Sequence, residues 1–166
     1  METIAVYFEP VAKTYGLHRI TGVVMVQTPL PFSTWARSGR AKPSPAAPSG
    51  RFSFVMLQTD PDGEAAILYA VAPPEEIPAV LESFGRSAAA GPGDPGPDLQ
   101  PVEMVLFQGP HFYERYGIAA AALDKLREKQ VVLLRAGFSG SMAQLVVPYG
   151  TAEPAMAALA ECLRFP

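Results

Sequence analysis

Cysteine is nearly absent from this chain of 166 residues, because Cys162 is the only one. A single cysteine excludes an internal disulfide and any metal site built from several cysteine ligands. Cys162 stands beside Leu163 in an apolar segment, so we expect a packed side chain and not a reactive thiol. The two histidines, His18 and His111, have no second ligand at a metal-type spacing. We therefore expect neither a metal nor another cofactor.

Charged residues are also few, at 17% of the chain, and the net charge is −3 with no basic run. This balance argues against a nucleic-acid partner, which would need clustered positive charge. The glycines form none of the common phosphate-binding motifs. No apolar run approaches the roughly 20 residues of a membrane span, and residues 1–10 lack the pattern of a secretory signal. We expect a cytoplasmic protein with no membrane partner.

The chain contains a pattern that occurs twice. Residues 7–17 resemble residues 106–118, and the apolar spacing of residues 77–84 returns in residues 156–163. The two copies of the first segment lie about 22 positions farther apart than the two copies of the second segment. The first copy must therefore hold about 22 additional residues between its two segments. A Pro/Ser/Gly-rich stretch at about 30–51 has this length and reads as an insertion.

The second copy reads as alternating strands and helices. We expect a strand at 102–107, a helix at 118–129, strands at 131–134 and 143–147, and a last helix capped by Thr151 with Pro154 in its first turn. Ser139-Gly140-Ser141 would form the turn of the hairpin. A closing strand should be short, absent or supplied by exchange.

The first copy predicts a similar order. We expect a strand at 3–8, a hairpin of 52–57 and 64–71 that turns at 60–63, and a helix that begins at 73–76. Residues 17–28 become a helix by alignment with the second copy, although Val23-Val24-Met25-Val26 favours a strand. The predicted domains are residues 1–86 and 102–166, joined by a Gly/Pro-rich linker at 87–101.

Few side chains suggest chemistry. His111, Phe112, Tyr113 and Tyr116 gather in one predicted loop, where they either plug the core or contact a ligand. Ser139 and Ser141 lack the surroundings of a catalytic serine. The main chain offers a clearer site, because the loop runs through Gly109 to a helix that starts near Gly117. Free N–H groups at such a helix start favour an anion such as a carboxylate.

Residues 116–163 resemble an ACT domain, and most closely the aspartokinase type. The matching features are Gly117-Ile118-Ala119-Ala120 at the start of the first helix, Leu126 within it, the strand at 131–134, Ser139 at the hairpin, Val146-Val147 and the Ala/Leu-rich last helix. The first copy resembles this domain more faintly, through Tyr15-Gly16-Leu17, the turn at 60–63 and the helix at 77–84.

The resemblance implies an α+β fold of two ferredoxin-like βαββαβ units, each with an antiparallel sheet and helices on one face. ACT domains bind amino acids or similar metabolites where two units pair. By position, the resemblance places ligand contacts in the loop 108–118 and the facing edge 137–141. The candidate ligand-binding residues are Gln108, Gly109, His111, Tyr116, Gly117, Ile118, Gly137, Phe138, Ser139 and Ser141.

These features lead to a regulatory hypothesis. The chain would be a non-enzymatic module that binds an amino acid, pairs as a homodimer or between its own units, and acts on a partner enzyme. One alternative is a structural or interaction module that has lost the ligand site. A second alternative is a small enzyme that uses His111 with Tyr113 or Tyr116 as acid and base.

Overall fold

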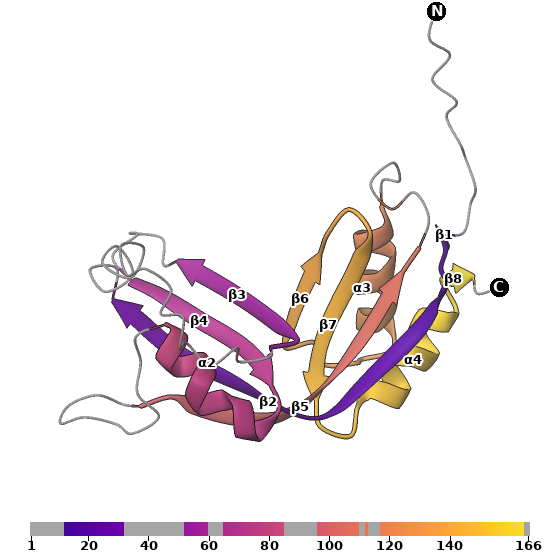
Figure 1. Cartoon of the computed structure of the whole chain (residues 1–166). Helices are drawn as coiled ribbons and strands as arrows, with labels where there is room; N and C mark the ends of the chain where they lie inside the picture. Colours follow the sequence, from indigo (N-terminus) through magenta and orange to yellow (C-terminus); the bar gives the residue numbers. More distant parts are fainter. Residues whose placement is uncertain are drawn as a thin grey trace, which may run out of the picture. The chain divides into compact units, whose positions relative to one another are not determined.

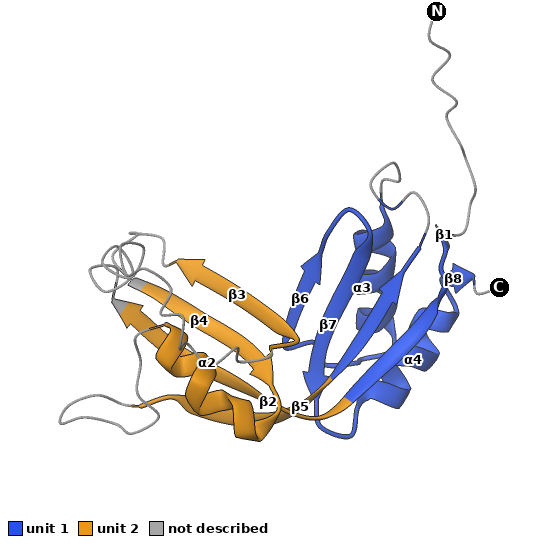
Figure 2. Ribbon diagram, viewed as in Figure 1, with its two compact units in different colours: residues 1–20, 104–166 blue, residues 21–103 orange. Residues whose placement is uncertain are grey.

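A computed structural model of the chain describes residues 12–31, 52–59, 65–84, 96–109, 112 and 117–164. The chain divides into two compact units (Figure 2). Unit 1 comprises residues 1–20 and 104–166, and unit 2 comprises residues 21–103. Two long strands, β2 (Gly16–Pro31) and β5 (Asp98–Gln108), contain the boundaries, so each contributes residues to both units.

Unit 1 is a sheet with the strand order β2-β5-β7-β6 and two helices (Figure 1). Its remaining elements are β1 (Ala12–Lys13), α3 (Ile118–Glu128), β6 (Arg135–Phe138), β7 (Met142–Pro148), α4 (Ala152–Ala160) and β8 (Leu163–Arg164). Strands β6 and β7 are antiparallel, with Arg135 opposite Val146. Alternate residues of β5 and β7 bury against both helices in one apolar cluster, so the helices cover one face.

Unit 2 has the strand order β3-β4-β2-β5. Its own elements are β3 (Phe54–Thr59), β4 (Ala65–Ala72), the 3₁₀ turn η1 (Pro74–Glu76) and α2 (Ile77–Ser83). Both strand pairs around β4 are antiparallel, with Val71 opposite Phe54 and Ala70 opposite Val26. Ile77, Val80 and Leu81 of α2 pack on this sheet as the apolar spacing predicts.

In the described residues the two units share one strand order, and the chain has the predicted α+β, ferredoxin-like fold. In unit 1, β5, β6 and β7 form the first three strands, and the start of β2 occupies the fourth position beside β5. In unit 2, β2, β3 and β4 form the first three strands, and the start of β5 takes the fourth position. The fourth strand of unit 1 therefore comes from a distant segment, while β8 pairs in parallel with β1.

This interleaving replaces the predicted split into residues 1–86 and 102–166. The reason is that residues 17–28, predicted as a helix, belong to strand β2, where the β-branched run decides the conformation. The alignment of Leu17 with Ile118 was wrong, because Leu17 lies in a strand and Ile118 opens helix α3. Residues 98–101 of the predicted linker also lie in a strand, β5.

The buried face of the last helix is one residue out of register with the predicted alignment. Helix α2 buries Ile77, Val80 and Leu81, whereas α4 buries Ala155, Ala158 and Leu159 at the same spacing. Thr151 does precede α4 as predicted. Its hydroxyl, however, donates to the Pro148 carbonyl at 2.7 Å and does not cap the helix.

Residues 131–134, predicted as a strand, lead into β6 instead. Helix α3 closes with Gln130 at φ 56° and with the Val131 N–H donating to the Leu126 carbonyl at 2.9 Å, which is a Schellman-type ending. This turn delays the strand to Arg135, while Val131 and Leu133 still pack against the core. The predicted strand 3–8, the turn 60–63 and nearly all of the insertion 30–51 lie outside the described residues.

Ion pairs join α3 to the residue after α4. The Glu161 carboxylate lies 2.6 Å from Lys129 Nζ and 3.5 Å from Lys125 Nζ, and Lys125 also pairs with Glu128 at 2.7 Å. The hydrogen bond from Lys129 lowers the pKa of Glu161 below 4.5. The hydrogen bond to Glu128 raises the pKa of Lys125 above 10.5. These groups are exposed, so each pair adds little to stability.

We expect Glu161→Gln to lower the melting temperature slightly at pH 7 and low salt. A lowered pKa in the folded state gives stability that is present above pH 4.5 and is lost as the pH falls through the folded value. The difference from the wild type, measured by calorimetry, should shrink below pH 4.5 and at high salt. Asp124→Asn removes a pair within α3 only and serves as the control. A deficit that grows in acid would contradict this account.

Candidate functional site

The predicted ligand loop begins where β5 ends. Gln108 is exposed, and its carbonyl accepts a hydrogen bond from the Tyr15 N–H at 2.8 Å. Gly109 is buried, and a Cβ at this position would overlap the Lys13 carbonyl oxygen and the ring of Phe112. Glycine is therefore required here because the main chain of Lys13 approaches so closely.

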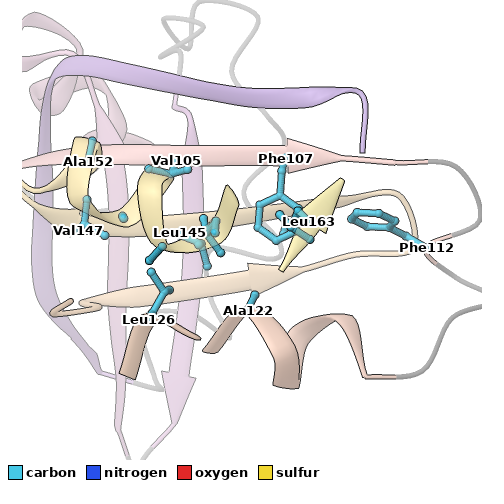
Figure 3. Close-up of a cluster of buried hydrophobic side chains, with 13 residues drawn as sticks. Val105, Phe107, Phe112, Ala122, Leu126, Leu145, Val147, Ala152 and Leu163 are labelled. Atoms are coloured by element: carbon cyan, nitrogen blue, oxygen red, sulfur yellow. The ribbon is translucent and has the colours of Figure 1, made fainter. Parts of the chain in front are cut away.

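Phe112 anchors the loop to the core of unit 1. Its side chain is 8% exposed, and its ring meets that of Phe107 edge to face, with centroids 5.9 Å apart and an angle of 67°. Figure 3 shows the Phe112 ring at one end of the cluster, beyond Phe107 and Leu163. Of the two roles open for this aromatic loop, Phe112 takes that of a core plug.

The loop ends at the start of α3. Gly117 is exposed, has φ +88°, and precedes the helix without any side chain capping its first turn. An added Cβ would meet nothing within 4 Å, so space around this main chain is open. Uncapped N–H groups and the helix dipole suit a carboxylate at this place. Ile118 is half-buried against the core, while His111 and Tyr116 lie outside the described residues.

The predicted facing edge is the β6–β7 hairpin. Gly137 is half-buried opposite Gln144, Phe138 is 40% exposed, and Ser141 is exposed. The Ser139 hydroxyl donates to the Met142 carbonyl at 3.1 Å and accepts from the Met142 N–H at 3.2 Å. Ser139 therefore holds the turn, as expected for a serine next to glycine.

A shallow apolar hollow of about 140 Å³ lies on unit 1, close to the loop. Its lining is Ile20, Leu106, Phe107 and Met142, together with the polar side chains of His18 and Gln108. Because Gln108 and Met142 share it, the loop and the hairpin meet at the same end of the sheet. Only Gln108 of this lining was predicted. His18 and Ile20 reach the hollow because residues 16–20 form a strand beside β5, and Met142 reaches it because β7 lies on the other side of β5.

The described residues offer little catalytic chemistry. No group of three His, Cys, Asp or Glu side chains within them could hold a metal ion. Burial raises the pKa of the half-buried Cys162 thiol, whose Sγ lies 3.4 Å from the Leu159 carbonyl oxygen. Its packing against the core agrees with the predicted structural role. None of the described helices is long and apolar enough to cross a membrane.

Solved structures share this fold over almost the whole chain. The ligand-free regulatory subunit of aspartate kinase from Thermus thermophilus matches with a TM-score of 0.68 and 12% identity, covering 91% of this chain and 99% of its own. Aspartate kinases from Clostridium acetobutylicum and Synechocystis match with TM-scores of 0.66 and 0.65, at 12% and 15% identity. Those matches cover 93% and 96% of this chain but only 35% and 29% of the enzymes.

No protein-family model and no curated protein matches the sequence. At such low identity, the structural matches establish the fold. The chain has the ferredoxin-like fold of the ACT-containing regulatory domains of aspartate kinase, as the sequence resemblance predicted. This chain matches nearly the whole length of the regulatory subunit, whereas it spans only about a third of the length of the complete kinases.

We expect Gly109→Ala to reduce the free energy of unfolding by about 3 kcal/mol, because the new methyl group meets main chain that cannot easily move. Gly117→Ala should cost only about 1 kcal/mol, from the left-handed backbone conformation alone. Urea denaturation of the wild type and both variants measures the two losses in free energy of unfolding. Equal costs, or a larger cost at Gly117, would contradict the proposed close contact with Lys13.

Proposed function

We propose that this protein is a regulatory module that binds an amino acid or a related metabolite and passes the effect to a partner. The observation that carries the proposal is the match over 91% of this chain to nearly the whole of an aspartate kinase regulatory subunit. The likeness in fold extends over nearly the whole of that subunit, which supports the same general role for this chain.

The proposed ligand site is the loop Gln108–Ile118 with the hairpin edge Gly137–Ser141. The open main chain at Gly117 suits the carboxylate of an amino acid. The hollow beside Gln108 is lined almost entirely by apolar atoms. Small-molecule sites are lined predominantly by apolar side chains, which supports this place for the ligand.

Regulation would follow from differential affinity. A ligand that binds one arrangement of the units better than another shifts the population toward that arrangement. The same coupling must act in both directions, so the partner would also change the affinity for the ligand. In this role the chain supplies no catalytic residue of its own.

Pairing with a second copy is proposed through the edge of unit 1. Strand β6 is the last strand in its sheet order, and its outer main-chain groups can pair with another strand. Leu123 of α3, Val132 before β6 and Phe138 within β6 are each at least 38% exposed. Exposed apolar side chains beside an open edge favour a homodimer, and they equally favour an interaction module without a ligand.

A panel of the common amino acids tests the sensing function by thermal shift. A ligand at 100 times its dissociation constant stabilises the folded form by about 2.7 kcal/mol. For a chain of this size we expect the melting temperature to rise by roughly 5 °C or more for particular amino acids.

Variants locate the site of this shift. Gly117→Val should abolish it by filling the open space before α3, and Gly150→Val is the matched control. Gly150 has φ +80° and equally open surroundings, but it precedes α4. If no amino acid shifts the wild type, the sensing proposal is wrong, and the interaction module becomes the better explanation.

Phe138→Asp tests the proposed pairing. A charge at the β6 edge should weaken dimerisation about tenfold or more, because it would be desolvated in the interface. Phe52→Asp, at an exposed position of unit 2, is the control and should leave dimerisation unchanged. Sedimentation equilibrium measures both dissociation constants. A wild-type monomer at all concentrations, or equal effects of both variants, would contradict pairing through β6.

A further inference from the structure

Residues Lys13–Tyr15, here called the strap, contact two separate parts of unit 1. The Thr14 N–H donates to the Arg164 carbonyl at 2.8 Å, and the next N–H, of Tyr15, donates to the Gln108 carbonyl at 2.8 Å. The Lys13 carbonyl lies against Gly109, as the blocked Cβ position there shows. The strap therefore joins the start of the loop to strand β8.

Apolar packing makes the same connection. Phe112 of the loop, Phe107 of β5 and Leu163 of β8 belong to one buried cluster, and they lie at its same end (Figure 3). Thr14 itself is only 3% exposed, and its hydroxyl also lies 3.4 Å from the Arg164 carbonyl. Moving either the loop or β8 would thus disturb the contacts of the strap.

The strap and β8 are individually weak. Strands β1 and β8 pair over two residues each, which is too little to persist without further contacts. Within the described residues, the loop and β8 contribute only Phe112 and Leu163 to the buried cluster, whereas β5, β7, α3 and α4 contribute its other members. Regions with few buried contacts open at lower free energy than the whole fold.

We propose that the strap, β8 and the residues Gln108, Gly109 and Phe112 form one cooperative element, the terminal clasp, which opens and closes while the rest of unit 1 stays folded. The clasp couples the conformation of the loop to the terminal strands. A change that orders the loop would tighten β8, and a change that releases β8 would loosen the loop. This coupling goes beyond the proposed function and does not depend on any ligand.

Amide hydrogen exchange tests the clasp from the loop side. Gly109→Ala should reduce the protection of the Thr14 amide, which bonds to β8, by about tenfold or more. The Leu134 amide, bonded to the Val146 carbonyl at 2.9 Å in the same unit, reports opening of the rest of the sheet, and in the wild type it should exchange through an opening of higher free energy than the Thr14 amide does. Gly150→Ala adds similar backbone strain outside the clasp and should leave the Thr14 amide near its wild-type protection.

The reverse experiment starts from β8. Arg164→Pro removes the main-chain donor of this residue and adds ring bulk, whereas Arg164→Ala changes only an exposed side chain. The proline variant should lower the protection of the Tyr15 amide, which bonds to Gln108, by about tenfold, and the alanine variant by less than about twofold.

Two results would overturn the proposal. If Thr14 and Leu134 exchange with equal opening free energies in the wild type, the clasp opens only with the whole unit. If Gly109→Ala leaves Thr14 unchanged, or Arg164→Pro leaves Tyr15 unchanged, the loop and β8 are independent. Neither result bears on the amino-acid panel, so the clasp and the sensing function are tested independently.

Discussion

The main-chain pairing of β5 is the constraint on which the rest of unit 1 depends. β5 carries its buried residues between Val102 and Phe107, and a buried strand with neighbours in the sheet must have its N–H and C=O groups paired on both sides. β7 supplies one side, and the start of β2 supplies the other. A segment almost 90 positions earlier in the chain is therefore required to complete the unit, and β2 continues from there into unit 2.

Local patterns predicted the elements whose residues also interact locally. The alanine-rich stretch gave α3 to within one residue of its end, and the apolar spacing located α2 and α4. The prediction of a helix at residues 17–28 was wrong for the opposite reason. The similarity to the second copy indicated a helix, whereas the β-branched run formed a strand. The partners of this strand, β4 and β5, are distant in sequence, so no local pattern shows them.

The two glycines of the loop illustrate how far the site could be predicted. Gly117 stands before a predicted helix, and glycine can adopt the left-handed conformation that this residue has. Gly109 was selected because it follows a strand, but its real requirement comes from Lys13, which lies far away in sequence. The hollow beside Gln108 was missed for the same reason, since Ile20 and Met142 come together only in the folded sheet.

The contacts of unit 1 are distributed unevenly, and this matters for a regulatory role. Helices α3 and α4 share a continuous core, and ion pairs from Lys125 and Lys129 to Glu161 connect them at the surface. The described parts of the strap and of β8, in contrast, join this core only through Leu163 and the neighbouring Phe112, and β1 and β8 pair over two residues each. Binding can shift a population only where two arrangements differ by a small free energy, and such differences arise in weakly held elements on a rigid support. The proposed ligand loop begins at such an element and ends at the rigid one, which is the arrangement that a sensing module needs.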